Sequence, residues 1–192
     1  MTNGVLDFAE LFDYVKRHHT IPHKKKEPEV FGPFQDIYFR LVLSVADIPG
    51  WYIWIRVSTS ECPHILYVGQ SQTRTTSSLQ ARLKEEFLDE YVAIWGTVHK
   101  KEEAVQILSS KYEGNYTTGI KRAARKTGAT HIFWFGQSDL TDDELNYVEN
   151  KLIVILEPPA NKQKPKYIQM YPDLLVQALR QVKSGIDRLS MS

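Results

Sequence analysis

The chain has 192 residues, of which 42% are hydrophobic and 24% are charged. These are ordinary globular proportions, so they exclude wholesale disorder and fibrous proteins, and the length suffices for one domain with its own core. The net charge of +1 gives no overall argument for a nucleic-acid partner, so charge must be considered segment by segment.

The sequence predicts a cytoplasmic protein without a membrane partner. No apolar run approaches the roughly 20 residues that a membrane span requires, and the N-terminal residues lack a basic segment followed by a hydrophobic one. The single cysteine, Cys62, excludes an internal disulfide. With His64 it offers only two of the three or four ligands that zinc needs.

The first half of the chain is expected to begin with an N-terminal arm over residues 1–46. This arm would hold a short helix over residues 6–19 and a basic, proline-bearing loop. β-branched and aromatic residues, separated by turn formers, predict strands over residues 38–45, 51–57 and 64–69. The last two strands are expected to pair antiparallel.

A helix is expected to follow this hairpin, with Ser78 as its N-cap. Its apolar residues recur at helical spacing: Leu79, Leu83, Phe87, Tyr91 and Ile94. A second helix closed by Gly128 and a buried strand over 130–136 come next.

Two amphipathic helices complete the predicted elements. Thr141 and Glu144 form a capping box for the first, which a Glu-Pro-Pro sequence ends. Its apolar face is expected to hold Leu145, Val148, Leu152, Ile155 and Leu156. The tail helix, within 166–192, repeats the pattern and is expected to pack back or dimerise, with Leu175, Leu179, Val182, Ile186 and Leu189 on its apolar face.

The predicted fold class is therefore α+β. A small central mixed or antiparallel β-sheet, flanked by helices, would form a core over residues 47–165.

Glu149 does not fit a purely structural interpretation. It lies four residues after Leu145 and three before Leu152, so it projects from the apolar face of its helix. A buried carboxylate needs a cation, a hydrogen-bond network or a metal. A salt bridge to an arginine and a metal site are the two alternatives.

Other polar residues raise similar questions. Arg82 lies at the edge of the apolar face of its helix, where the plain alternative is an ion pair with Glu86 one turn later. Tyr52 and Tyr67 lie on the two paired strands, where tyrosines commonly serve packing but can also face one another. Asn161 follows the proline-broken helix end, 12 residues after Glu149, where asparagine commonly forms turns.

Taken in order, these elements resemble the GIY-YIG nuclease superfamily. They are "GWY" at 50–52, "YVG" at 67–69, Arg82 on the next helix, Glu149 on a late helix and Asn161 after a proline. The stretch "ENKLIVILEPPAN" carries the resemblance most specifically. Two three-letter motifs would be weak support, whereas five elements in order with the expected secondary structure are more specific.

This resemblance implies a divalent-metal-dependent endonuclease that hydrolyses DNA phosphodiester bonds, with Glu149 holding Mg²⁺ or Mn²⁺. Magnesium suits one glutamate because it keeps most of its waters. Arg82 would bind the scissile phosphate and Tyr52 would act as general base, which requires cations to lower its pKa from about 10. Tyr67 would orient water or phosphate, and Asn161 would donate a hydrogen bond to the same group.

The chain departs from the family pattern at two positions. Glu86 stands where many members have His or Tyr, and Gln70 where some have Lys. Glu86 either adds a metal ligand or indicates weakened catalysis. The longer loop after Tyr67 also distinguishes the chain from compact members.

Two basic stretches favour DNA as the partner. Seven basic and three acidic residues lie between positions 99 and 126, and five basic and one acidic residue between 161 and 183. We expect nucleic-acid contacts at Gln70, Lys121, Arg122, Arg125 and Lys162. A restriction-type enzyme is the suggested subtype, and cleavage of both strands favours a homodimer. The alternatives are a nucleic-acid-binding module that has lost cleavage and a plain interaction domain.

Overall fold

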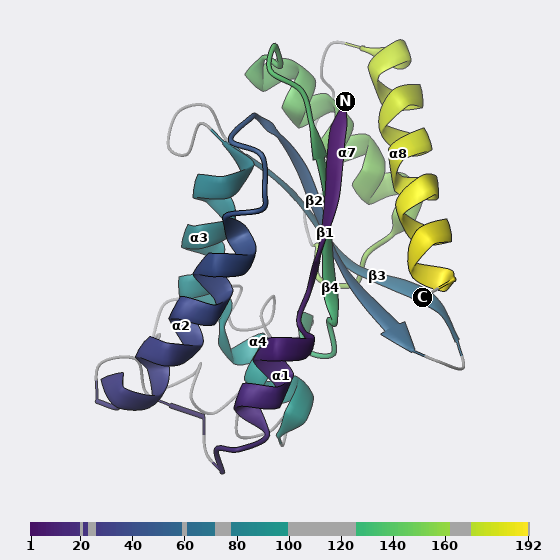
Figure 1. Ribbon diagram of the computed structural model, residues 1–192. Coiled ribbons are helices and arrows are strands. Elements are labelled where there is room, and N and C mark those ends of the chain that lie inside the picture. Colours follow the sequence, from purple (N-terminus) through teal and green to yellow (C-terminus); the bar gives the residue numbers. More distant parts are fainter. Residues whose placement is uncertain are drawn as a thin grey trace, which may run out of the picture.

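The computed structural model describes residues 1–19, 21–22, 26–58, 61–71, 78–99, 126–161 and 170–191. Over these residues the fold is α+β, with six helices around a four-stranded sheet in the order β1-β4-β2-β3 (Figure 1). Every strand pair in this sheet is antiparallel. The predicted fold class is thereby confirmed in its coarse form.

The four strands are β1 (Thr2–Asp7), β2 (Gly50–Ser58), β3 (Glu61–Gln70) and β4 (His131–Gly136). Strand β2 is central, and its six residues 50–55 are all buried, since side chains on both faces of the sheet are covered by helices. Its aromatic and β-branched composition suits such a position. The expected antiparallel pairing of β2 with β3 is confirmed.

Of the described helices, four cover one face of the sheet: α1 (Ala9–Val15), α2 (Pro28–Val42), α3 (Leu79–Glu90) and α4 (Val92–Val98). The apolar residues expected along the helix after Ser78 are all buried in this layer. The helix divides in two at Tyr91, whose hydroxyl donates to the Pro22 carbonyl at 3.0 Å.

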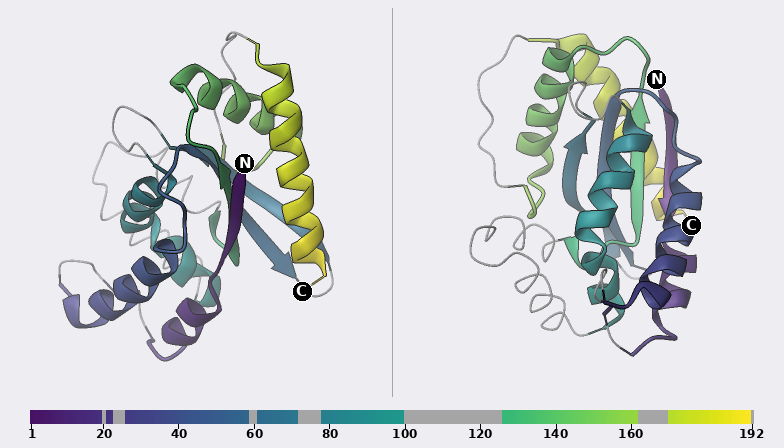
Figure 2. Two further views of the ribbon diagram at one scale, coloured as in Figure 1. Left: turned by 45° about the horizontal axis from the view of Figure 1, so that its top comes forward. Right: turned by 90° about the vertical axis from the view of Figure 1, so that its left-hand side faces the viewer.

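The other face is covered by α7 (Asp142–Leu156) and α8 (Pro172–Ser190), as the views in Figure 2 also show. The capping box of α7 is confirmed, because Thr141 accepts from the Glu144 amide and Glu144 accepts from the Thr141 amide. The tail helix packs back onto the sheet and buries Leu174, Ala178, Val182, Gly185 and Leu189. On α7, Ile155 is instead exposed.

Two predictions for the first 46 residues are wrong. Residues 38–45 are not a strand, since most of them belong to α2, and residues 6–19 are not one helix, since β1 ends at Asp7 and α1 begins at Ala9. Helix α2 begins at Pro28, whose fixed φ suits a first helical turn. Its buried residues follow helical spacing from there: Phe31, Phe34, Tyr38 and Val42.

The segment expected to be an arm is built into the fold. Strand β1 pairs with β4 along all six of its residues, and Leu6, Phe8 and Leu11 are buried in the helical layer beneath. In the part of the chain that the structure describes, no helix is long and apolar enough to cross a membrane.

Candidate active site

Tyr52 and Tyr67 lie on the same face of the sheet. In the register of β2 and β3, Tyr52 is opposite Gly69 and Tyr67 is opposite Trp54, so the two tyrosines are diagonal neighbours. Their ring centres are 6.1 Å apart. Both side chains are buried beneath the layer of α1 to α4.

Gly69 makes room for the Tyr52 ring. A Cβ atom at position 69 would overlap the ring carbon and hydroxyl oxygen at the end of the phenol. The glycine of the "YVG" motif therefore has a steric role here, because the ring of Tyr52 lies directly over the backbone of the neighbouring strand.

Helix α3 brings Arg82 and Glu86 to this pair of strands. Ser78 caps the helix by accepting from the Ala81 amide at 3.2 Å, which fixes the start of the helix. Glu86 Oε2 accepts a hydrogen bond from the hydroxyl of Tyr52 and lies 3.4 Å from Arg82 Nη2. The ion pair that the sequence offered as the plain alternative for Arg82 is therefore present.

Lys126 completes the cluster from the segment that precedes β4. Its ammonium forms an ion pair with Glu86 Oε1, and it lies 3.6 Å from the centre of the Tyr67 ring and 4.9 Å from that of Trp54. The Lys126 side chain is fully buried and that of Glu86 is 2% exposed, whereas the Arg82 side chain is 30% exposed. Arg82 is thus the charged member of the cluster that reaches solvent.

The structure brings together Tyr52, Tyr67 and Arg82, which are far apart in the sequence, and adds Glu86 and Lys126 to them. We name these five residues the Tyr-Arg cluster. Lys126 is marked in the sequence only by its place in a basic stretch, because no periodic pattern distinguishes it from its basic neighbours.

Asn161 has a different position from these residues. Its side-chain oxygen accepts from the Val68 amide and its side-chain nitrogen donates to the Val68 carbonyl, both at 2.8 Å. The Ala160 amide also donates to the Leu66 carbonyl. The asparagine therefore holds the chain after α7 against the outer edge of β3, with its amide group engaged by backbone.

Gln70 is buried on the face of the sheet that α7 covers. Its register partner is Trp51, and its side-chain nitrogen donates to Asn146 on α7 at 2.7 Å. Its side-chain oxygen is buried without a hydrogen-bond partner among the described residues. With 6% of its surface exposed, Gln70 lies inside the protein instead of on a nucleic-acid-binding surface.

Glu149 lies one helical turn after Asn146 on α7 and is half-buried, less enclosed than its place on the apolar face predicted. Helix α7 covers the face of the sheet opposite α3 (Figure 2), so Glu149 is on a helix of the other face and is not part of the Tyr-Arg cluster. Among the described residues, no three His, Cys, Asp or Glu side chains are grouped so as to hold a metal ion. Mg²⁺ needs only one or two protein carboxylates, so Glu149 alone fits this donor requirement.

Glu86 does not suit the metal role that remained open for it. One of its oxygens faces the ammonium of Lys126, and the other faces the guanidinium of Arg82 and the hydroxyl of Tyr52. A divalent cation there would face two positive charges at close range.

Four of the five predicted nucleic-acid contacts lie outside the described residues. They are Lys121, Arg122, Arg125 and Lys162.

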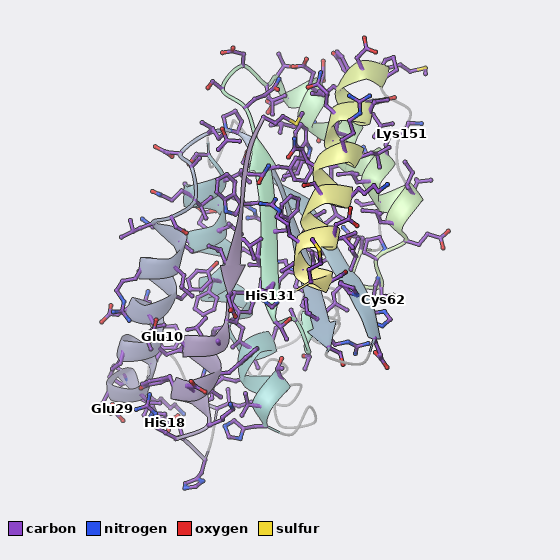
Figure 3. All side chains as sticks on the ribbon, turned by 45° about the vertical axis from the view of Figure 1, so that its right-hand side comes forward. Glu10, His18, Glu29, Cys62, His131 and Lys151 are labelled. Atoms are coloured by element: carbon purple, nitrogen blue, oxygen red, sulfur yellow. The ribbon has the colours of Figure 1, made fainter. Side chains whose placement is uncertain are left out.

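A separate cavity of about 840 Å³ lies at the other end of the sheet, near the C-terminal end of α8. Cys62 and His131, labelled in Figure 3, line it. Burial lowers the pKa of His131, while Asp7, 3.8 Å away, acts in the opposite direction. None of the predicted site residues that the structure describes lines this cavity.

No protein family, curated protein or solved structure matches the chain. The resemblance to the GIY-YIG nucleases therefore depends on the motifs and their order in the sequence.

Proposed function

We propose that the protein is a divalent-metal-dependent endonuclease that hydrolyses phosphodiester bonds of DNA. The observation that carries this proposal is the convergence of Tyr52, Tyr67 and Arg82 from β2, β3 and α3 on one face of the sheet. The sequence resemblance independently assigns these three residues to one site.

Arg82 is the proposed phosphate-binding residue. Its side chain is 30% exposed, and its planar guanidinium suits the oxygens of a phosphate group. In the transition state it stabilises the negative charge that develops on those oxygens. Its contact with Glu86 at 3.4 Å holds the guanidinium at the edge of the cluster.

Tyr52 is the proposed general base and Tyr67 the residue that orients the attacking water or the phosphate. The Tyr52 hydroxyl is buried and donates to Glu86, so to take a proton from the attacking water it would pass its own proton to the Glu86 carboxylate. Tyr67, with 7% of its surface exposed, lies beside it.

Glu149 would hold the metal ion, Mg²⁺ or Mn²⁺. When bound, such an ion polarises the phosphate oxygens and lowers the pKa of a water molecule. Asn161 supports this arrangement by holding the end of α7 against β3 through both of its hydrogen bonds to Val68.

Incubation of supercoiled plasmid with the protein and Mg²⁺ or Mn²⁺ tests the proposal. We expect nicked or linear products that EDTA prevents, and mapping of the cut ends defines the recognition sequence. A folded protein that leaves the plasmid intact with either metal would contradict the proposal.

The second candidate is a nucleic-acid-binding module that has lost cleavage. The observation that favours it is the carboxylate of Glu86, which contacts Tyr52, Arg82 and Lys126 at once and so engages the groups that catalysis requires. DNA binding that weakens with salt, without cleavage in any divalent metal, would support this candidate. Restriction-type specificity and a homodimer also remain proposals, which the mapped ends and a sedimentation measurement test.

A further inference from the structure

We propose that Lys126 neutralises Glu86 and so leaves the Tyr-Arg cluster with a net positive charge, at Arg82, for a phosphate group of the nucleic acid. This inference rests on the proposed function and adds a positioning residue to it.

The Tyr-Arg cluster contains three charged groups. Glu86 is within ion-pair distance of both Arg82 and Lys126. With Lys126 protonated and Glu86 ionised, the buried pair is neutral and the positive charge of Arg82 is left over. If Lys126 were uncharged, Glu86 would neutralise Arg82, and the three groups together would carry no net charge.

Burial differs among the three charged groups, and Arg82 is the most exposed of them. The Lys126 side chain is fully buried and the Glu86 side chain is 2% exposed, so water and salt screen their interaction little. Arg82, at 30% exposed, is the member that a phosphate group can approach from solvent. The buried ammonium of Lys126 therefore changes the electrostatic potential at the partly exposed guanidinium of Arg82.

Aromatic rings add to the stability of the buried cation. The Lys126 ammonium lies 3.6 Å from the centre of the Tyr67 ring and 4.9 Å from that of Trp54, distances at which ring faces attract cations. One ammonium thus contacts Tyr67 directly and reaches Tyr52 and Arg82 through a single carboxylate.

Glu85 is the other described charge near Arg82. Its carboxylate lies 3.8 Å from Arg82 Nη1 and its side chain is 56% exposed, so solvent screens this contact. Glu85 stays unchanged in every variant below, and the comparison between variants does not depend on it.

The test measures binding of a fluorescein-labelled DNA duplex by fluorescence anisotropy, in EDTA so that metal-dependent cleavage does not occur. Four proteins are compared over a series of salt concentrations: the wild type, Lys126→Met, Glu86→Gln and the double variant. The three groups then carry net charges of about +1, 0, +2 and +1, counted from full ionisation.

We expect Lys126→Met to bind DNA several-fold more weakly, with a slope of log affinity against log salt that is smaller by about one. Glu86→Gln should bind at least as tightly as the wild type. The double variant should recover both wild-type binding and the wild-type salt slope. Because removing Glu86 also relieves the buried carboxylate, the salt slope is the measurement that separates a charge effect from a structural one. Lys16→Met, which removes an exposed lysine just after the end of α1, is the matched control for loss of one positive charge.

Lys126→Met leaves Glu86 buried without its ammonium partner, so this variant is expected to be less stable. If it does not fold, Glu86→Gln and the double variant still decide between the outcomes. A double variant that binds as weakly as Lys126→Met, or four proteins that bind equally, would overturn the role of Lys126. If the four proteins bind equally, metal-dependent cleavage by the wild type would leave the nuclease proposal standing. If none of them binds DNA, both the nuclease proposal and the role of Lys126 would be overturned.

Discussion

The ammonium of Lys126 lies 3.6 Å from the centre of the Tyr67 ring, deep beneath the helical layer that covers this face of the sheet. The same ammonium forms an ion pair with Glu86, which accepts a hydrogen bond from Tyr52. The two tyrosines of the strand pair are therefore linked through a lysine and a glutamate from other parts of the chain.

Replacing Tyr52 with Phe removes one hydrogen bond to a buried carboxylate. Because hydrogen bonds to charged groups are strong, we expect the free energy of unfolding to fall by about 1.5–3 kcal/mol. Cleavage should fall by about 100-fold or more, the usual contribution of general base catalysis. Urea denaturation and plasmid cleavage measure the two effects.

Tyr38→Phe is the matched control for this variant. The Tyr38 hydroxyl is also buried, but it donates to the Leu83 carbonyl outside the cluster. Its loss should lower the free energy of unfolding by about 0.5–1.5 kcal/mol and leave cleavage unchanged. Wild-type cleavage by Tyr52→Phe would reject the base assignment.

Gly69→Ala should disturb the cluster through sterics alone. The added methyl group would overlap the Tyr52 ring, which its hydrogen bond to Glu86 holds in place. We expect a loss of about 1–3 kcal/mol in the free energy of unfolding, as for overpacked cores. Gly32→Ala is the control, because a Cβ on this residue of α2 meets open space and should raise stability by about 0.5–1 kcal/mol. Equal effects of the two changes would show that Gly69 does not serve the Tyr52 ring.

Glu149→Ala is expected to abolish metal-dependent cleavage while the protein stays folded. The side chain is half-buried on α7, so its removal exposes little core, whereas loss of the proposed metal ligand removes the chemistry. Plasmid cleavage and thermal melting are the measurements. Glu29→Ala, an exposed carboxylate on α2 (Figure 3), should cleave normally. Retained cleavage in Glu149→Ala would defeat the metal assignment.

The sequence predicted the elements around the site well where local signals were strong. Ser78 caps α3 and Thr141 caps α7, each through hydrogen bonds to residues close in the sequence. Gly69 makes room for Tyr52 on the paired strand. The strand prediction for residues 38–45 is wrong because their β-branched and aromatic composition is typical of a strand. The helical spacing of the buried residues becomes visible only from Phe31 onward.

The site was harder to predict because its contacts are long-range. Glu86 was visible as a departure from the family pattern, but its ion pair with Lys126 joins residues 40 positions apart. Local spacing carries no information about such a contact. The bonds of Asn161 to the backbone of Val68 join residues 93 positions apart, whereas the family resemblance implies water or a phosphate as the partner.

The protein should lose stability as the pH falls below about 6.5, the ordinary pKa of histidine, and His131 should contribute to this loss. Burial lowers the pKa of His131 in the folded protein, so the unfolded chain takes up a proton at higher pH than the folded one. The contribution of His131 to the free energy of unfolding is therefore lost progressively as the pH falls from about 6.5 to the folded-state pKa. The difference in melting temperature between pH 7.5 and pH 5.5 should be smaller for His131→Gln than for the wild type.

Asp7→Asn should have the opposite effect to His131→Gln on the pH dependence of the melting temperature. Because Asp7 raises the pKa of His131, its removal should lower that pKa further and enlarge the difference in melting temperature. A smaller difference in Asp7→Asn, or an unchanged one in His131→Gln, would contradict this account of His131.

The most direct measurement is the rate of plasmid cleavage by Arg82→Ala with Mg²⁺, beside Arg40→Ala as control. Both variants lose an arginine from an ion pair, but Arg40 pairs with Glu10 on the exposed surface of α1 and α2. We predict that Arg40→Ala cleaves like the wild type and that Arg82→Ala is slower by about 100-fold or more, as for loss of a group that stabilises transition-state charge. Equal cleavage by the two folded variants would contradict the assignment of the Tyr-Arg cluster as the active site.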